Sequence, residues 1–480
     1  MVDPTTGRVA TQTGIVRDPF PNNQVPIRST IASNLLPFFP VISGPQTTGN
    51  FPGTNGDLQV RKDIAYWLVK VDENISERHK LSASFNLTRR PRVDTNGNGL
   101  APPNPLSNWD NQKVTTKNGR LAYDITLRPN VLNHFSFGYS RFNNPHFYFD
   151  FHKDISQLGF KGLPRSDQGL PTINFANQGG FVYQPLGGHA PKNQVIENNF
   201  VFDDNLTWIK GRHSFKFGGG IRANRLNNHI FDTVGGSSGE FTFSARQTTL
   251  PGLAQTGDSF ASFLLGSVNA FRASDEVDMA ARRKRFSWFV QDDIKATKKL
   301  TLNIGLRYDI QLPTYDANNR SESFIPALSN PDAGGLPGAI AFAGQNGFGR
   351  RFSDVWYRGL GPRFGFAYAM REKTVLRGAY GIFMAGSGFD DFFAIFNRDF
   401  FFTIDCSENL NQRDPAFFLD DGPPANCFSP AVQSPGVENG KSLNATTPPG
   451  YITFPRPAGY FRTCSSGHSE FNASSRRLHR

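Results

Sequence analysis

The chain has 480 residues, a formal net charge of +11 and 38% apolar residues, which leaves room for several globular domains or one large single-layer fold. Its mean hydropathy is −0.42, and it lacks any apolar run near the roughly 20 residues that a membrane-spanning helix needs, which argues against a helical membrane protein. A β-barrel stays compatible with this composition, because its strands need only about 9–11 residues and half of their side chains face a polar lumen.

The positive charge does not indicate nucleic-acid binding. The dense basic runs are 282–285, 350–351 and 476–477, and no nucleic-acid-binding module surrounds them, so we expect solvated loops. The three cysteines, Cys406, Cys427 and Cys464, lack the paired spacing of a zinc site. A disulfide between Cys406 and Cys427 in an oxidising compartment is left open.

The first 60 residues are rich in Pro, Gly, Thr and Asn, and they predict a loop-rich linker with one helical turn at most, within 31–41. The N-terminus MVDPTTGRVATQTG has neither a basic region nor an apolar core, so it does not read as a signal peptide.

From residue 61 the alternation of apolar and polar residues predicts β-hairpins. The expected pairs of strands are 64–71 with 80–90, 121–127 with 135–139, 200–208 with 215–221, 285–295 with 300–310, and 364–370 with 374–384. The alternation is cleanest in 300–310. There we expect Leu302, Ile304 and Leu306 to face lipid, and Asn303, Gly305 and Arg307 to face a polar lumen.

The connections between hairpins are long, at 91–116, 144–194, 224–284 and 314–360, and they read as structureless loops, with one helix expected at 258–266. Short turns that alternate with long loops are typical of outer-membrane barrels. The sequence therefore predicts an all-β fold, a partial antiparallel transmembrane β-barrel of about ten strands with short periplasmic turns and long extracellular loops. We expect the barrel to occupy 61–404, an extracellular loop-like region 405–460, and an out-of-frame tail 461–480; 389–404 reads as a strand or a loop plug.

Motifs of catalysis are missing from the sequence. It contains no HExxH, GxSxG or CxxC pattern, and we nominate no catalytic, cofactor-binding or metal-binding residue. His134 and His213 are interpreted as polar residues of the lumen or the turns. The adjacent carboxylates Asp292 and Asp293, like those at 390–391, point to opposite faces of a strand, so they cannot act together on one substrate.

Three stretches carry a resemblance to a known family. They are FSWFVQDDIKATKKLTLNIGLRYD at 286–309, GPRFGFAY at 361–368 and TVLRGAYGIF at 374–383. They resemble the barrel of TonB-dependent outer-membrane receptors and are most similar to the Oar-like group. FVFDDNLTWIKGRHSFKFGGGI at 200–221 is similar to a hairpin of the same group, DSFASFLLG at 258–266 to its loop motif, and 18–42 to the linker before its barrel strands.

The resemblance implies an outer-membrane location and contact with lipid. It further implies a barrel of about 22 strands with a plug, no enzymatic activity, and uptake of a bulky extracellular ligand driven by TonB with ExbB and ExbD. About ten of those strands are expected here, without plug, TonB-contacting segment or signal peptide, so a gene fragment or a misread frame is the expectation.

Two other classes of function stay open beside the receptor barrel. A secreted or surface β-protein that acts as an adhesin or glycan-binding module would use the aromatic loops for contacts. A soluble enzyme is the least favoured class, because the motifs of catalysis are missing.

Overall fold

A computed structural model describes most of the chain. The described residues are 19–39, 60–94, 100, 102–107, 109–148, 154–165, 169–176, 185–188, 193–230, 238–249, 256–274, 277–331, 334–345, 347–351, 354–384, 403–406, 414–429, 437–438, 441–442 and 463–465. The Asp390–Asp391 pair lies outside these ranges. Nearly all of the tail 461–480, which we expect to be translated from a shifted reading frame, lies outside them as well.

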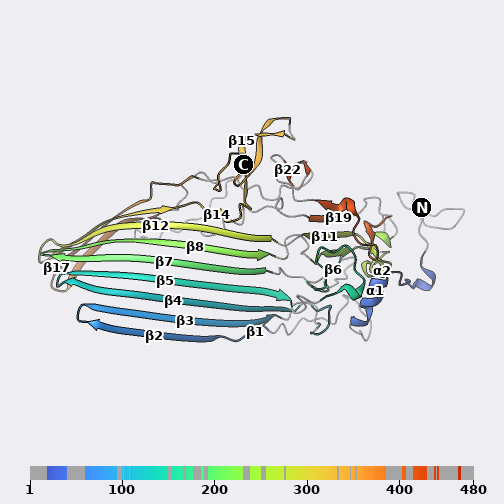
Figure 1. Cartoon of the computed structure of the whole chain (residues 1–480), viewed down its shortest axis with the longest axis horizontal. Helices are drawn as coiled ribbons and strands as arrows, with labels where there is room; N and C mark the ends of the chain where they lie inside the picture. Colours follow the sequence, from blue (N-terminus) through green and yellow to red (C-terminus); the bar gives the residue numbers. More distant parts are fainter. Residues whose placement is uncertain are drawn as a thin grey trace.

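Ten long antiparallel strands form the body of the molecule and run side by side along its long axis (Figure 1). They are β2 (Ala65–Ser76), β3 (His79–Asp94), β4 (Asp110–Arg128), β5 (Val131–Tyr148), β7 (Asn193–Lys210), β8 (His213–Ile230), β12 (Val277–Lys295), β13 (Leu300–Gln311), β17 (Leu360–Arg371) and β18 (Thr374–Met384). Three short strands complete this sheet: β1 (Val60–Lys62), β14 (Tyr315–Asp316) and β24 (Thr463–Ser465). The prediction of about ten strands is confirmed. Within the described ranges no pairing joins β2 to β18, so the sheet is open.

All five tight turns between the long strands lie at one end of the sheet (Figure 1). The β7–β8 turn places Gly211 at φ 59°, a conformation that glycine adopts without steric cost. The predicted turn at 72–79 is wrong in length, because β2 continues to Ser76 and pairs Asp72 with Ser82. The polar residues at the end of β2 form backbone hydrogen bonds with β3 although they have no apolar face. A prediction from hydropathy alone therefore places the start of the turn too early.

The long connections at the other end are not structureless, which corrects the expectation from composition. They contain β6 (Thr172–Phe175), β9 (Glu240–Phe243), α2 (Ser259–Leu264), β10 (Ser267–Val268), β11 (Ala270–Ser274), β15 (Glu322–Asn330) and β16 (Leu336–Phe342). Before the first hairpin, α1 (Thr30–Leu35) lies where one helical turn was expected. After the last hairpin come β19 (Thr403–Cys406), β20 (Phe417–Phe418), β21 (Phe428–Ser429), β22 (Val437–Glu438) and β23 (Lys441–Ser442). Single 3₁₀ turns add η1 (Pro21–Asn23), η2 (Leu36–Phe38), η3 (Ser156–Leu158), η4 (Ala245–Gln247) and η7 (Ala425–Cys427).

A compact unit forms where several of these connections meet, and we call it the loop module. Its sheet has the strand order β21-β19-β11-β9-β6, and α1 and α2 lie beside it (Figure 1). Its core is rich in phenylalanine: the rings of Phe241 and Phe271 lie 4.4 Å apart, and Phe243 meets Phe263 edge-on at 5.3 Å. Buried aromatic pairs contribute more to the stability of a fold than the burial of their apolar area alone. These loops therefore have a hydrophobic core of their own.

Helix α2 confirms the helix predicted at 258–266. Asp258 caps it, because its carboxylate accepts hydrogen bonds from the backbone N–H groups of Phe260 and Ala261 at 2.8 and 3.1 Å. Phe263 is fully buried in the module, so its role is packing.

Helix α1 is held by a carboxylate 390 residues away in the sequence. Oδ2 of Asp420 accepts a hydrogen bond from Thr30 N–H at 2.7 Å, and Oδ1 accepts one from the Ser29 hydroxyl at 2.6 Å. Burial alone raises the pKa of the Asp420 carboxyl, but the bonds from Ser29, Thr30 and Ile31 outweigh it, and the pKa is lowered. The first and last described parts of the module are thereby joined.

We expect acid to release α1 from the module. The pKa of Asp420 is lowered in the folded state, so its contribution to stability is fully present above the ordinary carboxyl value of 3.8 and is lost as the pH falls from there through the lowered pKa of the folded state. Hydrogen-exchange protection factors of residues 30–35 should drop over this range by an amount typical of a lost helix cap, about 1 kcal/mol. In an Asp420→Asn variant this pH dependence should vanish; its persistence would contradict the assignment to Asp420.

Cys406 and Cys427 form a disulfide, a pairing that the sequence alone left open. The bond joins residues 21 apart and ties β19 to η7 in the loop module. Closing a loop of this size stabilises a fold by about 3 kcal/mol.

Candidate functional site

The ten-stranded sheet has one continuous apolar face. Alternate side chains of the strands build it, and register keeps them in rows across strands: Phe137 stands opposite Phe202 and Trp288 opposite Tyr308, with ring centroids 4.8 and 6.1 Å apart. Large side chains exposed on this face include Trp67, Phe85, Leu121, Phe202, Trp288, Ile304, Leu306, Phe364 and Tyr380. So large an exposed apolar surface requires an apolar partner.

The opposite face is polar and is organised in three bands that run across the strands. The acidic band contains Asp72, Ser82, Ser136, Asp203, Ser287 and Asp309. The cation band contains Lys70, Arg120, Arg222 and Arg285. The asparagine band contains Asn86, Asn118, Ser140, Asn199 and Asn224. Neighbouring bands lie two residues apart along each strand, about 7 Å.

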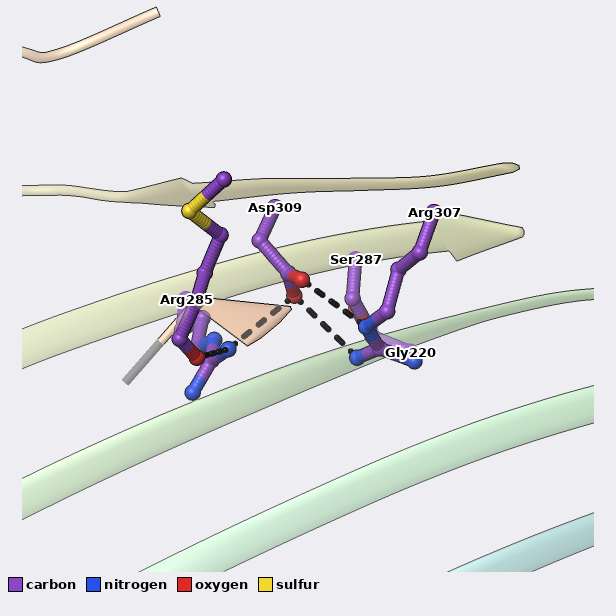
Figure 2. A network of polar contacts seen from close by, with 6 residues as sticks. Gly220, Arg285, Ser287, Arg307 and Asp309 are labelled. Atoms are coloured by element: carbon purple, nitrogen blue, oxygen red, sulfur yellow. Dashed lines mark hydrogen bonds and ion pairs between the residues drawn. The ribbon is translucent and has the colours of Figure 1, made fainter. Parts of the chain in front are cut away.

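A charge network joins the acidic and cation bands on β12 and β13. Figure 2 shows the guanidinium groups of Arg285 and Arg307 on either side of the Asp309 carboxylate. Arg307 donates two hydrogen bonds to Asp309, from Nε at 2.8 Å and from Nη2 at 3.1 Å, and Arg285 Nη2 lies 3.2 Å away. The Asp309 side chain is 3% exposed, so two cations compensate one buried carboxylate.

The asparagine band is held by bonds between its own amides. Asn118 donates to Asn86 at 2.7 Å, and Asn224 donates to Asn199. Asn199 in turn donates to Glu197 at 3.0 Å. Because a primary amide offers two donors and two acceptor lone pairs, each side chain is oriented by one or two bonds and keeps further capacity.

Nearer the tight turns, Asp293 accepts hydrogen bonds from Lys216 at 3.1 Å, Gln291 at 2.9 Å and Asn303 at 2.5 Å. Beside it lies a hollow of about 260 Å³, lined by Gln291, Asn303, Ile304, Gly305, Arg363, Phe364, Gly365, Ala379, Tyr380, Gly381 and Phe383. The Arg363 guanidinium lies 4.7 Å from the centroid of the Phe383 ring, which covers one side of the hollow. Glycines open this space, because side chains there would fill it.

No cluster of three or more His, Cys, Asp or Glu side chains able to hold a metal ion occurs among the described residues. The profile of the family described as "Outer membrane beta barrel domain" matches residues 1–457.

The chain belongs to this outer-membrane β-barrel family. Its location is therefore the outer membrane. In such barrels side chains alternate between lipid and interior, so the apolar face meets lipid and the polar bands face the lumen. The tight turns are periplasmic and the loop module is extracellular.

Solved structures of outer-membrane proteins are similar at low identity. They include the transporter YddB from Escherichia coli (12% identity, TM-score 0.40, 75% of this chain and 39% of that chain) and FpvA from P. aeruginosa bound to pyoverdine (9%, 0.37, 73% and 40%). The ferric-catecholate import receptor Fiu from E. coli K12 in its open form has 14% identity and a TM-score of 0.35, with 68% and 48% covered. This chain thus spans less than half of the length of these proteins. No curated protein sequence matches it.

Neither α-helix in the described ranges has the length and apolar character that crossing a membrane requires.

The histidines, adjacent aspartates and lumen arginine noted in the sequence have the following positions in the barrel wall. His134 faces the lumen, with Nδ1 2.6 Å from Oδ1 of Asp124. His213 begins β8 beside a tight turn and lies 2.7 Å from Asp292. Asp292 and Asp293 take different partners on opposite faces, His213 and Lys216, as expected from strand geometry. Arg307 faces the lumen and forms an ion pair with Asp309.

Sequence reasoning missed the three bands. Several strands carry Asn or Arg at lumen positions, but these residues align only once the register between strands from different hairpins is known. Only Asn86 lies within a predicted strand; Asn118, Asn199 and Asn224 lie just outside the predicted bounds, because the strands of the structure are longer than the hydropathy pattern indicates.

Proposed function

We propose that the chain forms part of the barrel of a TonB-dependent receptor of the Oar-like group, which takes up a bulky ligand across the outer membrane. The observation that carries the proposal is the polar lumen face, whose charged and amide side chains are held in bands by their own hydrogen bonds. A purely structural barrel wall has no need of exposed, unpaired arginines such as Arg120 and Arg222 in its lumen.

The proposed partners are outer-membrane lipid on the apolar face, an extracellular ligand in the lumen, and TonB with ExbB and ExbD as the source of energy. We propose that 61–404 is the barrel region, after a linker at 1–60 and before extracellular loops at 405–460. The chain itself performs no chemistry in this proposal, because transport needs binding and passage only.

Lipid contact is tested with single cysteines on β12, in a Cys464→Ser background and after export of the chain to the outer membrane. Trp288 lies on the apolar face and its neighbour Ser287 on the polar face. A fluorophore at Trp288→Cys should be quenched strongly by brominated lipid, and one at Ser287→Cys weakly. Equal, weak quenching at both positions contradicts the barrel and favours a secreted adhesin.

Energy coupling is tested by formaldehyde cross-linking of the full-length gene product in its native cells. A species recognised by antibodies against both the receptor and TonB supports uptake. If the protein inserts correctly into the membrane but no such cross-linked species forms, the result contradicts TonB-driven uptake and favours binding of the ligand at the cell surface.

A further inference from the structure

Two arginines in the lumen have no ionic partner. Arg120 on β4 and Arg222 on β8 are exposed, and among the described residues neither makes a hydrogen bond or an ion pair. The other cations of their band differ, since Lys70 binds Asp72 at 2.7 Å and Arg285 binds Asp309. The free guanidiniums are therefore available to an anion from outside the chain.

Register fixes the spacing of the two free arginines. Arg120 pairs with Gly138, Gly138 with Val201, and Val201 with Arg222, so three strand-to-strand steps separate them. At 4.7–4.9 Å a step this is about 14 Å between backbones. Of the two residues between them, Gly138 carries no side chain and Val201 a short one, and the β5 residues two positions away on either side of Gly138 are serines.

The asparagine band runs parallel to this gap on its extracellular side. Asn118 lies two residues before Arg120 on β4, and Asn224 lies two residues after Arg222 on β8. Each amide is oriented by a hydrogen bond, Asn118 to Asn86 and Asn224 to Asn199, and keeps further donor and acceptor capacity. Amide groups of this kind bind neutral hydroxyls, whereas the guanidiniums bind carboxylates through two parallel bonds.

We propose that the cation and asparagine bands bind an acidic oligosaccharide that lies across β4, β5, β7 and β8. Two carboxylates of the sugar chain meet Arg120 and Arg222, and hydroxyls on the extracellular edge of the same sugar chain meet Asn118 and Asn224. A single small anion satisfies only one guanidinium, and an apolar ligand would cover both guanidiniums without giving either a partner, which is costly. This inference names the ligand class of the proposed function and rests on it.

The test is a calorimetric titration of the full chain in detergent micelles with oligogalacturonate, whose sugars each carry a carboxylate. The methyl ester of the same oligomer is the matched probe, because it keeps the hydroxyls and removes the charge. We expect the acid to bind at least tenfold more tightly than the ester, and its affinity to fall as salt is added. Monomeric galacturonate should compete far more weakly than the oligomer.

Two variants locate the site. Arg120→Gln with Arg222→Gln should weaken binding of the acid by about a hundredfold, since a hydrogen bond to a charged group is worth roughly tenfold or more, and should leave binding of the ester unchanged. Arg377→Gln is the control, because Arg377 is exposed on the same face of β18 but outside the bands. Retained heat-modifiable migration in gels shows that both variants still fold.

Equal affinity for acid and ester, an unaffected double variant, or an equal loss in the control overturns the proposal. Competition by the monomer at the same concentration as the oligomer also overturns it, because it indicates a site for small anions. A chain that inserts into the outer membrane but fails this titration refutes the ligand class and leaves the barrel assignment intact.

Discussion

Replacing Ile304 with arginine is expected to destabilise the barrel by about 2–4 kcal/mol, the cost of a charge on the lipid side near the middle of the bilayer. Ile304 is 46% exposed on the apolar face, next to Leu306. The free energy of unfolding is measured by urea titration of the chain folded into lipid vesicles.

The matched control is Asn303→Arg, one residue away on the lumen face. Asn303 donates a hydrogen bond to Asp293 at 2.5 Å, and an arginine there can still donate to the same carboxylate, so we expect little loss. Equal losses at the two positions would contradict the assignment of the faces.

Removal of the Asp309 carboxylate, as Asp309→Ala, should cost about 3 kcal/mol or more, because it leaves Arg285 and Arg307 close together and uncompensated. Both guanidiniums bind this one carboxylate, which is 3% exposed (Figure 2). The loss is measured by the same urea titration in vesicles.

Asp72→Ala is the control for this network. Lys70 and Asp72 repeat the spacing of Arg307 and Asp309 on another strand, and their atoms lie 2.7 Å apart, but their side chains are 61% and 37% exposed. Water screens such a pair, so no measurable change is expected. If Asp309→Ala is as harmless as Asp72→Ala, the lumen network makes no contribution to stability.

The sheet was predictable because its determinants are local. Alternation along 300–310 and a short polar turn are enough to define a hairpin, and the expected strands 374–384 and 300–310 agree with β18 and β13 to within one residue. Strand ends such as 72–76 were missed, because polar residues outside the bilayer carry no alternation of hydropathy. The loop module was missed because its core brings together residues such as Ile31, Phe241 and Ile404, whose contacts leave no local pattern.

In the candidate site, too, features set by one strand could be predicted, and features set by contacts between strands could not. The face occupied by Arg307 could be predicted from its own strand, whereas the near-complete burial of Asp309 depends on Arg285 from the strand beside it. Arg120 and Arg222 were ordinary charged residues in the sequence. That they lie in one row on the lumen face follows only from their pairing through Gly138 and Val201, and thus from the register of four strands.

The bond between Asp420 and helix α1 also determines the order in which the molecule can assemble. Each long hairpin closes a tight turn and can form as soon as its own residues are available, since such contacts cost little chain entropy. The loop module needs residues 29–31 and 420 together, so it cannot be completed before nearly the whole chain exists. Protection of α1 therefore reports a contact between two parts of the chain that lie about 390 residues apart, which no single hairpin can report.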